Sequence, residues 1–205
     1  MFMLSTHTKA LDMKVPAPLT ELPPRILETQ RLTLRALQHG DNEVMFKAYA
    51  GNSVATKYMS FPCASSSQES LPFLQGVVAN FAGQESAHKE FSWLIFRKDV
   101  GECIGSVGLG VNSPTALGGG YILHPSAWGE GFATEAWQAV VEWAKAQPNV
   151  QRVVAEHHPD NPASGNVMRK AGFECEGLHE KHAVLPNVGP DKVDMVVWAW
   201  NRSKS

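Results

Sequence analysis

A glycine-bearing loop between an apolar strand and an amphipathic helix constrains this chain more than any other segment. Residues 121–136 read YILHPSAWGEGFATEA, so an apolar stretch and a turn precede Gly129 and Gly131. Glycines allow a tight turn in which several backbone N–H groups point at one anion. The helix that follows adds its own unpaired N–H groups and the positive end of its dipole. The segment therefore predicts a phosphate-binding loop.

The bulk composition favours one domain without a nucleic-acid or membrane partner. The chain has 205 residues, of which 43% are hydrophobic and 19% charged, and its formal net charge is -2. That charge leaves no electrostatic footprint for nucleic acid, and no apolar run reaches the ~18 residues that span a bilayer. Cys63, Cys103 and Cys175 are widely spaced, as is typical of reduced thiols. Because a secretion signal is also missing from the N-terminus, we expect a cytoplasmic protein.

The pattern along the chain predicts a mixed sheet. Residues 1–25 hold four prolines and no sustained periodicity, so we expect a tail or linker there and a single domain over residues 26–205. The predicted order is β-α-α-β-β-β-α-β-α-β-β, in which hairpins precede one strand-loop-helix-strand unit. The expected strands cover 31–35, 91–96, 103–110, 118–123, 152–157, about 173–182 and 193–200, and the helices cover 41–50, 71–81, 133–144 and 161–171.

Other nucleotide sites compete for the glycine loop. Gly129-x-Gly131-x-x-Thr134 nearly matches the dinucleotide fingerprint, and Glu156 follows at the spacing of a ribose-binding acid. That fingerprint requires the strand to run directly into its first glycine, whereas residues 124–128 intervene here. A P-loop is excluded because no Gly-Lys-Ser/Thr follows. A dinucleotide site and an ordinary strand-to-helix connection stay open as alternatives.

A second motif follows the next predicted strand. Residues 161–173 read NPASGNVMRKAGF. Asn161 and Pro162 suit an N-cap and a first-turn proline, and Gly172 suits the end of the helix. The motif therefore predicts a short helix that begins one strand after the glycine loop.

The two motifs together resemble the GCN5-related N-acetyltransferases (GNAT), and the RimJ/RimL-like branch is the closest group. The segments LETQRLTLR (27–35) and GYILHP (120–125) also resemble that branch. The likeness spans roughly residues 26–200. It implies an α+β fold: a central mixed, mostly antiparallel sheet with a splayed parallel strand pair, flanked by about four helices.

The resemblance implies acetyl-CoA as cosubstrate. In that family the loop amides hold the pyrophosphate, and the pantetheine arm lies between the two splayed strands, here those ending near Leu123 and Glu156. A backbone N–H near Ile122 or Leu123 would polarise the thioester carbonyl. The implied CoA-binding residues are Ile122, Leu123, Trp128, Gly129, Glu130, Gly131, Phe132, Ala133, Thr134, Asn161 and Ser164.

Two of these residues have a structural interpretation as well. Ser164 matches the serine proposed as acid for the CoA thiolate, and Asn161 matches an asparagine that contacts the pantetheine arm. Asn161 is also a natural N-cap, and a first-turn hydroxyl such as that of Ser164 satisfies free backbone N–H groups. Trp128 stands where Gln or Arg is frequent in the family, and we expect it to pack beneath the loop.

The general base is where the chain departs from the family. Glycines 118–120 replace a frequent glutamate, and residues 181–183 read KHA where the RimL-type glutamate is expected. Besides Ser164, our candidate catalytic residues are Glu156 and His158, while His157 and His182 stay open as alternatives. Because neighbours on a strand face opposite ways, His157 and His158 are a poor chelate, and we predict no metal.

The leading functional prediction is an N-acetyltransferase that moves the acetyl group of acetyl-CoA to a primary amine by direct attack in a ternary complex. The amine would be a protein N-terminus or a small molecule. An acyl-CoA-binding module with little turnover is the alternative, because the strand glutamate is missing. The resemblance also suggests a homodimer.

Overall fold

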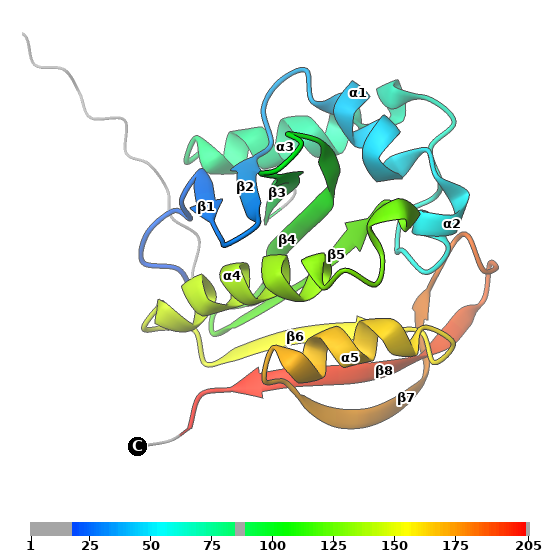
Figure 1. Ribbon diagram of the computed structural model, residues 1–205. Helices are drawn as coiled ribbons and strands as arrows, with labels where there is room; N and C mark the ends of the chain where they lie inside the picture. Colours follow the sequence, from blue (N-terminus) through cyan, green and yellow to red (C-terminus); the bar gives the residue numbers. More distant parts are fainter. Residues whose placement is uncertain (1–17, 85–88, 204–205) are drawn as a thin grey trace, which may run out of the picture.

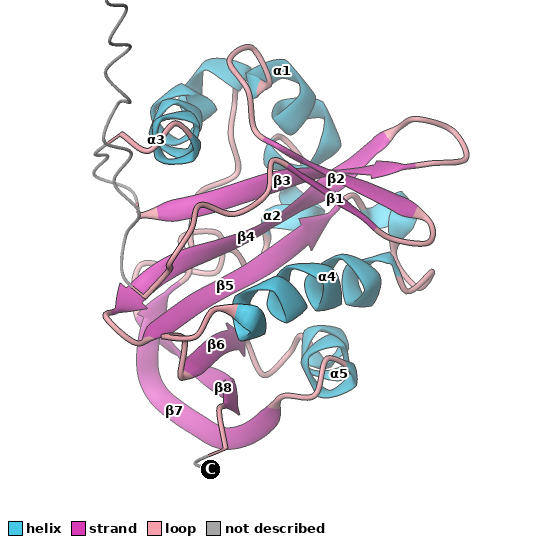
Figure 2. Ribbon diagram, turned by 90° about the vertical axis from the view of Figure 1, so that its left-hand side faces the viewer, coloured by secondary structure: helices cyan, strands magenta, loops and turns pink. Residues whose placement is uncertain are grey.

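The computed structural model describes residues 18–84 and 89–203, which form one eight-stranded sheet covered by helices on both faces (Figures 1 and 2). The strands are β1 (Ile26–Glu28), β2 (Leu32–Ala36), β3 (Glu90–Arg97), β4 (Cys103–Ser113), β5 (Ala116–Leu123), β6 (Arg152–His157), β7 (Glu174–Val184) and β8 (Lys192–Asn201). The helices are α1 (Asn42–Met45), α2 (Ser53–Thr56), α3 (Leu71–Phe81), α4 (Phe132–Ala146) and α5 (Pro162–Lys170), with shorter turns η1 (Phe46–Ala50), η2 (Ser67–Ser70) and η3 (Pro125–Ala127).

The sheet confirms the predicted fold class. Its strand order is β1-β2-β3-β4-β5-β6-β8-β7, and every neighbouring pair is antiparallel except β5 and β6. The parallel pair is short, because only residues 116–118 of β5 pair with residues 152–154 of β6. Beyond Gly118 and Val154 the two strands separate and form a fork, which is the splayed pair that the resemblance implied.

The two faces of the fork meet different helices. Tyr121 on β5 contacts Trp137 of α4 and Ser164 of α5, so its face is the one that α4 and α5 cover (Figure 2). Gly120 and Ile122 point the other way, because side chains alternate along a strand. On that opposite face the Tyr49 hydroxyl of η1 bonds to Ser106, which pairs with Ile122. Side chains at the fork can therefore approach a ligand from either face.

The helix predicted over residues 41–50 begins at the expected place but changes its winding. Asp41 makes no side-chain cap, because its carboxylate accepts hydrogen bonds from Arg35 at 2.9 and 3.0 Å and from the Gln38 N–H at 2.7 Å. After Met45 the chain forms the π-helical turn η1, in which the Gly51 N–H bonds to the carbonyl five residues earlier.

The strand predicted over residues 31–35 is confirmed as β2, and a short strand that was not predicted, β1, precedes it. β1 pairs with β2 after a turn over residues 29–31. In that turn the N–H of Thr29 donates to the Leu32 carbonyl at 2.9 Å. The turn places Arg31 beside the N-terminus of α4, where its guanidinium contacts the glycine loop.

Residues 18–25 contact the domain, and residues 1–17 of the predicted tail lie outside the described residues. Leu19 is buried, and the Pro24 carbonyl accepts a hydrogen bond from the Trp93 indole at 2.9 Å. The Arg25 guanidinium donates to the Phe81 carbonyl at 2.8 Å. This segment therefore covers the end of β3 and α3.

Candidate active site

The glycine loop has the backbone geometry that the sequence predicts. Gly129 and Gly131 have φ of 83° and 82°, a left-handed conformation that residues with a side chain rarely adopt. Gly131 is the N-cap of α4 and makes no side-chain cap bond, so the first N–H groups of the helix stay open to a ligand. A Cβ on Gly129 would meet no atom within 4 Å, so space remains beside the loop.

Hydrogen bonds made by Glu135 and Arg31 hold the glycine loop in place. The Glu135 carboxylate accepts hydrogen bonds from the Thr29 hydroxyl, the Arg31 N–H and the Arg31 Nε, each at 2.7 Å. Burial alone would raise the pKa of this carboxyl, but the hydrogen bonds from Thr29 and Arg31 outweigh it, so the pKa lies below its ordinary value. Arg31 also donates to the Glu130 carbonyl at 2.9 Å and lies over the Phe132 ring. Arg31 thus ties the β1–β2 turn to the loop.

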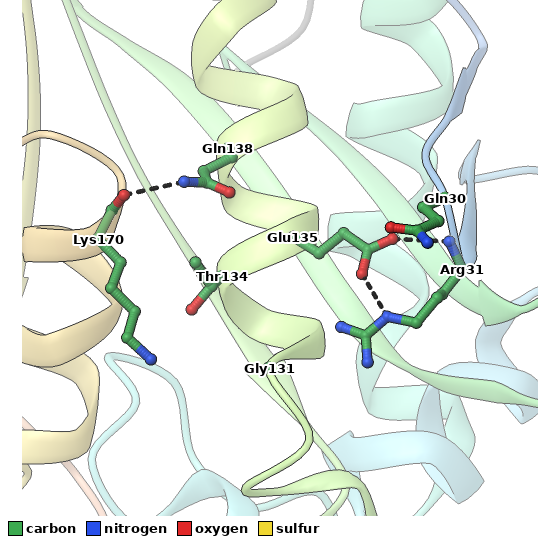
Figure 3. Close-up of a pocket in the computed structure, with 7 residues that line it drawn as sticks. All are labelled: Gln30, Arg31, Gly131, Thr134, Glu135, Gln138 and Lys170. Atoms are coloured by element: carbon green, nitrogen blue, oxygen red, sulfur yellow. Dashed lines mark hydrogen bonds and ion pairs between the residues drawn. The ribbon is translucent and has the colours of Figure 1, made fainter.

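An open pocket of about 380 Å³ lies at the N-terminus of α4 (Figure 3). Thr134 and Lys170 lie on one side of the first helical turn, and Glu135 and Arg31 lie on the other (Figure 3). The sequence predicted Gly131 and Thr134 as ligand contacts but not the cations of Arg31 and Lys170, because these two residues come from other segments of the chain. The lining residues are Gln30, Arg31, Gly131, Thr134, Glu135, Gln138 and Lys170. Backbone N–H groups with nearby cations suit a phosphate-bearing ligand.

Trp128 closes the turn before the loop. Its indole N–H donates to the Leu123 carbonyl at 3.0 Å, although half of the side chain (51%) stays exposed. Leu123 and Ile122 are themselves buried in the part of β5 that lies beyond the fork. The tryptophan therefore has a local structural contact, and the side chains of Ile122 and Leu123 belong to the core.

The fork leaves room for a slender ligand arm. A Cβ on Gly120 would meet no atom within 4 Å, and Gly120 pairs with Gly108 on β4. The surface of β5 is therefore open at Gly120 on the face of η1. Strands that separate also leave backbone groups for a ligand to bond. These features fit a pantetheine arm, for which Asn161 and the N–H groups near Ile122 and Leu123 would be the contacts.

Ser164 lies at this fork and is bonded to Tyr121. The two hydroxyl oxygens are 2.7 Å apart, and the Tyr121 hydroxyl also reaches the Ser164 carbonyl at 3.1 Å. Burial raises the pKa of the Tyr121 phenol to about 12, so it stays protonated at neutral pH. An aromatic residue on a strand as apolar as β5 usually belongs to the core. In the structure Tyr121 is only half-buried, and its polar end joins the candidate acid.

Asn161 occupies the predicted N-cap position of α5, but its side chain makes no cap hydrogen bond. Instead, its carbonyl accepts a hydrogen bond from the Ser164 N–H at 3.1 Å. The side-chain capping role is therefore wrong, and the amide group stays available for a ligand.

His157, the last residue of β6, and the neighbouring His158 differ in accessibility. His157 is buried, its Nδ1 lies 2.8 Å from the His158 carbonyl, and its Nε2 approaches Gly165 of α5 so closely that an added Cβ there would stand at 2.6 Å. This residue is structural. His158 faces away from α5 and stacks on Tyr58 with ring centroids 4.8 Å apart. Its Nδ1 accepts a hydrogen bond from the Asp160 N–H at 3.1 Å.

Glu156 lies two residues beyond the point where β5 and β6 separate. Its carboxylate pairs with the His182 imidazole, Nε2 to Oε2, at 3.0 Å. Both side chains are partly exposed. The structure therefore brings Glu156 together with the open alternative His182, and it places His158 in a separate stack with Tyr58.

The fold and the site together define a class of protein with a β-loop-α unit beside a forked sheet, whose open N–H groups and nearby cations suit a phosphate-bearing ligand. The Acetyltransferase (GNAT) domain family matches residues 31–174. A relative named an uncharacterized N-acetyltransferase, YoaA of Bacillus subtilis (strain 168), is 30% identical over 155 residues, which cover 75% of this chain and 85% of the relative. The chain therefore belongs to the GNAT family and is an acetyl-CoA-dependent N-acyltransferase.

Two further comparisons involve proteins with named substrates. The [Ribosomal protein uS5]-alanine N-acetyltransferase of Escherichia coli (strain K12) is 25% identical over 177 residues, covering 82% of this chain and 87% of that enzyme. The solved structure of RimL, a ribosomal L7/L12 alpha-N-protein acetyltransferase in complex with coenzyme A, superimposes with a TM-score of 0.73 at 23% identity. That match covers 86% of this chain and 97% of RimL, and it supports the fold.

Residues 18–84 and 89–203 contain neither a candidate membrane-spanning helix nor a cluster of side chains suited to a metal ion. None of the helices there has the length and hydrophobicity that crossing a bilayer requires. In the same ranges no group of three or more His, Cys, Asp or Glu side chains is arranged to hold a metal ion.

Proposed function

We propose that this enzyme acetylates a primary amine, carried by a peptide N-terminus or a small molecule, by direct attack on acetyl-CoA in a ternary complex. The observation that carries the proposal is the fork: a bare glycine strand on one face and the bonded hydroxyls of Tyr121 and Ser164 on the other. The glycines and Tyr121 lie on β5, the strand that leads into the glycine loop, and Ser164 lies on α5. A ligand held by its phosphates at the loop could thus extend its other end to the fork.

The chain supplies the parts that such a reaction needs for binding. The N–H groups of residues 129–134 would hold the pyrophosphate, with Lys170 and Arg31 as nearby cations. The amide of Asn161 would contact the pantetheine arm. A backbone N–H near Ile122 or Leu123 would stabilise the negative charge that develops on the thioester oxygen. Most of the rate acceleration would come from holding the two substrates together.

The Tyr121–Ser164 hydroxyl pair would stabilise the thiolate of the departing CoA. At neutral pH both hydroxyls carry their protons, since the pKa of Tyr121 is raised to about 12. Ser164 would donate a hydrogen bond to the thiolate, and the bond from Tyr121 would orient it. A proton from the acetylated amine would finally reside on the sulfur.

The acceptor would enter from the opposite face, between α2 and the β7–β8 loop. Asn187 of that loop joins the two walls, because its side chain accepts a hydrogen bond from Cys63 N–H at 2.8 Å and donates to the carbonyls of Thr56 and Phe61 at 2.8 and 2.9 Å. A defined wall on each side favours an extended or small acceptor. The relatives that act on ribosomal protein N-termini support peptides as first candidates.

The test is a thiol-release assay. The protein is incubated with acetyl-CoA and a panel of six-residue peptides beginning with Ala or Ser, amino acids and polyamines, and free CoA thiol is measured. We expect thiol release that depends on one acceptor class, and thermal stabilisation by CoA. Binding of acetyl-CoA without acceptor-dependent release would leave only an acyl-CoA-binding module. Stabilisation by NAD(P) and not by CoA would contradict the cosubstrate assignment itself.

A further inference from the structure

An ion pair crosses the sheet on the face that the acceptor would approach. Glu156 on β6 and Gly177 on β7 both pair with Val197 of β8, so the 3.0 Å contact between Glu156 and His182 passes over β8. The side chains are 38% and 42% exposed, which lets a substrate reach either group. Neither Glu156 nor His182 is among the residues that we propose to contact CoA.

A bulge in β7 turns His182 toward Glu156. Between the pairs His179–Met195 and Ala183–Val193, β7 has two more residues than β8. Lys181 has φ of 47°, the one positive φ among the non-glycine residues that the structure describes, and its N–H donates to Asp194 Oδ1 at 2.8 Å. The bulge is thus held by a specific hydrogen bond, as bulges near active sites often are.

The position of the pair relative to the fork follows from strand alternation. Glu156 is two residues beyond Val154, the last residue of β6 that pairs with β5. The neighbouring His157 packs on α5, so Glu156 points to the opposite face, which Gly120 shares. Tyr121 and Ser164 lie on the α5 face. The two proton-transferring groups therefore lie on opposite sides of the space where the thioester would be.

We propose that Glu156 and His182 form the general base of the reaction, which rests on the proposed function. An acceptor ammonium, R–NH3+, gives one proton to the pair. The freed lone pair forms the C–N bond as the C–S bond of the thioester breaks. The second excess proton on nitrogen passes to the sulfur, which leaves as the thiol, and the pair returns its proton to solvent. An imidazole held by a carboxylate suits this work because the ring nitrogen can accept a proton and the carboxylate stabilises the imidazolium that forms.

Other charged groups surround the pair and enter the pH dependence. His179 of β7 touches the His182 ring edge-on at 5.2 Å, and Lys181 and Asp194 lie in the bulge. His158, which follows β6, is stacked on Tyr58 of the segment after α2. Glu176 of β7 interacts electrostatically with His179.

Glu90 is the rival base. It begins β3, and its Oε1 would lie 3.2 Å from a Cβ on Gly108, the partner of Gly120. Its carboxylate is thus on the acceptor face too, but on the β4 side of the fork. A substitution at Glu90 therefore has to be compared with substitutions in the Glu156–His182 pair.

The experiment compares E156Q, H182Q and the double variant with wild type, using the acceptor peptide from the thiol-release panel. We expect kcat/KM at pH 7 to fall by about 10²-fold in each single variant, with no further loss in the double variant, because the two residues act as one base. In the variants kcat/KM should rise tenfold per pH unit through the neutral range, as only free amine reacts. Affinity for acetyl-CoA should stay unchanged.

The matched control is E176Q. Glu176 is also on β7, and its carboxylate bonds Arg152 across the same sheet at 2.6 Å, away from the fork. Its kcat/KM should stay within about twofold of wild type. A readout without turnover is the NMR signal of the His182 ring, assigned by its loss in H182Q. Adding the peptide to the CoA-bound protein should shift it.

The outcomes separate the two proposals. Absence of CoA binding, or of turnover by wild type with every amine, refutes the proposed function and the base with it. Turnover by wild type with E156Q and H182Q equally active refutes the base alone. A severe loss in E90Q with active pair variants transfers the role to Glu90. An unshifted His182 ring signal also overturns the inference.

Discussion

Replacing Glu135 by glutamine tests how the CoA loop is held. Glutamine keeps one acceptor oxygen and loses the charge, so the two 2.7 Å hydrogen bonds from the Thr29 hydroxyl and the Arg31 N–H become weaker and the bond from Arg31 Nε is lost. Hydrogen bonds to a charged group contribute about 1.5–3 kcal/mol each, but the Arg31 guanidinium is largely solvated, which reduces its part to about 0–1 kcal/mol. We therefore expect E135Q to lower the free energy of unfolding by about 1–3 kcal/mol.

The assay is unfolding of E135Q and wild type by heat and by urea, followed by circular dichroism. For a chain of this size the loss corresponds to a decrease in Tm of about 2–12 °C. Glu142 on the same helix is the control, because its only ion pair with a residue that the structure describes is the exposed one with Lys145. E142Q should change stability by about 0–0.5 kcal/mol. E135Q should also weaken CoA binding about fivefold, since Arg31 no longer orients the Glu130 carbonyl.

The pH dependence gives the sharper check. Hydrogen bonds hold the pKa of Glu135 below its ordinary value of 4.5 in the folded protein. A lowered folded-state pKa means that the stabilisation is complete above the unfolded-state pKa and is lost as the pH falls through the folded-state one. The difference between E135Q and wild type should be full at pH 7 and shrink below about pH 4.5. A difference that is absent at pH 7, or unchanged at pH 3, would refute the reasoning.

Three further predictions concern the fork and its walls. Y121F removes the hydroxyl that bonds Ser164, so kcat should fall about tenfold while calorimetry shows unchanged CoA affinity. N187A removes the three bonds between the β7–β8 loop and the segment after α2, and the KM for the peptide should rise more than that for acetyl-CoA. G165A places a Cβ 2.6 Å from His157 Nε2, and urea unfolding should show a loss of about 1–3 kcal/mol.

The parts of the site that the sequence could predict are those set by local conformation. Gly129 and Gly131 predict a positive φ, because glycine alone adopts this conformation without strain. The structure confirms it at both positions. Asn161 and Pro162 mark the start of α5 for a similar reason, although the expected side-chain cap is not made. The phosphate-binding role of the loop stays a prediction, since it concerns a ligand rather than the chain's own backbone.

Contacts between distant segments could not be predicted in this way. Arg31 and Glu135 are far apart in sequence, and their contact depends on the β1–β2 turn, where only one strand was expected. The bond between Tyr121 and Ser164 depends on how α5 packs over β5. An aromatic residue in an apolar strand looks like core whether or not its hydroxyl meets a polar partner.

The Glu156–His182 pair shows most clearly why the sequence pattern was insufficient. With strict alternation, His179 and His182 would point to opposite faces of β7, because they are three positions apart in the sequence. Their rings nevertheless meet at 5.2 Å, since the bulge adds two residues and Lys181 adopts a left-handed conformation. A bulge is specified by long-range pairing with β8, through contacts such as Asp194 with Lys181. Periodicity along β7 carries no sign of the bulge, so the contact between His182 and Glu156 could be identified only from the folded sheet.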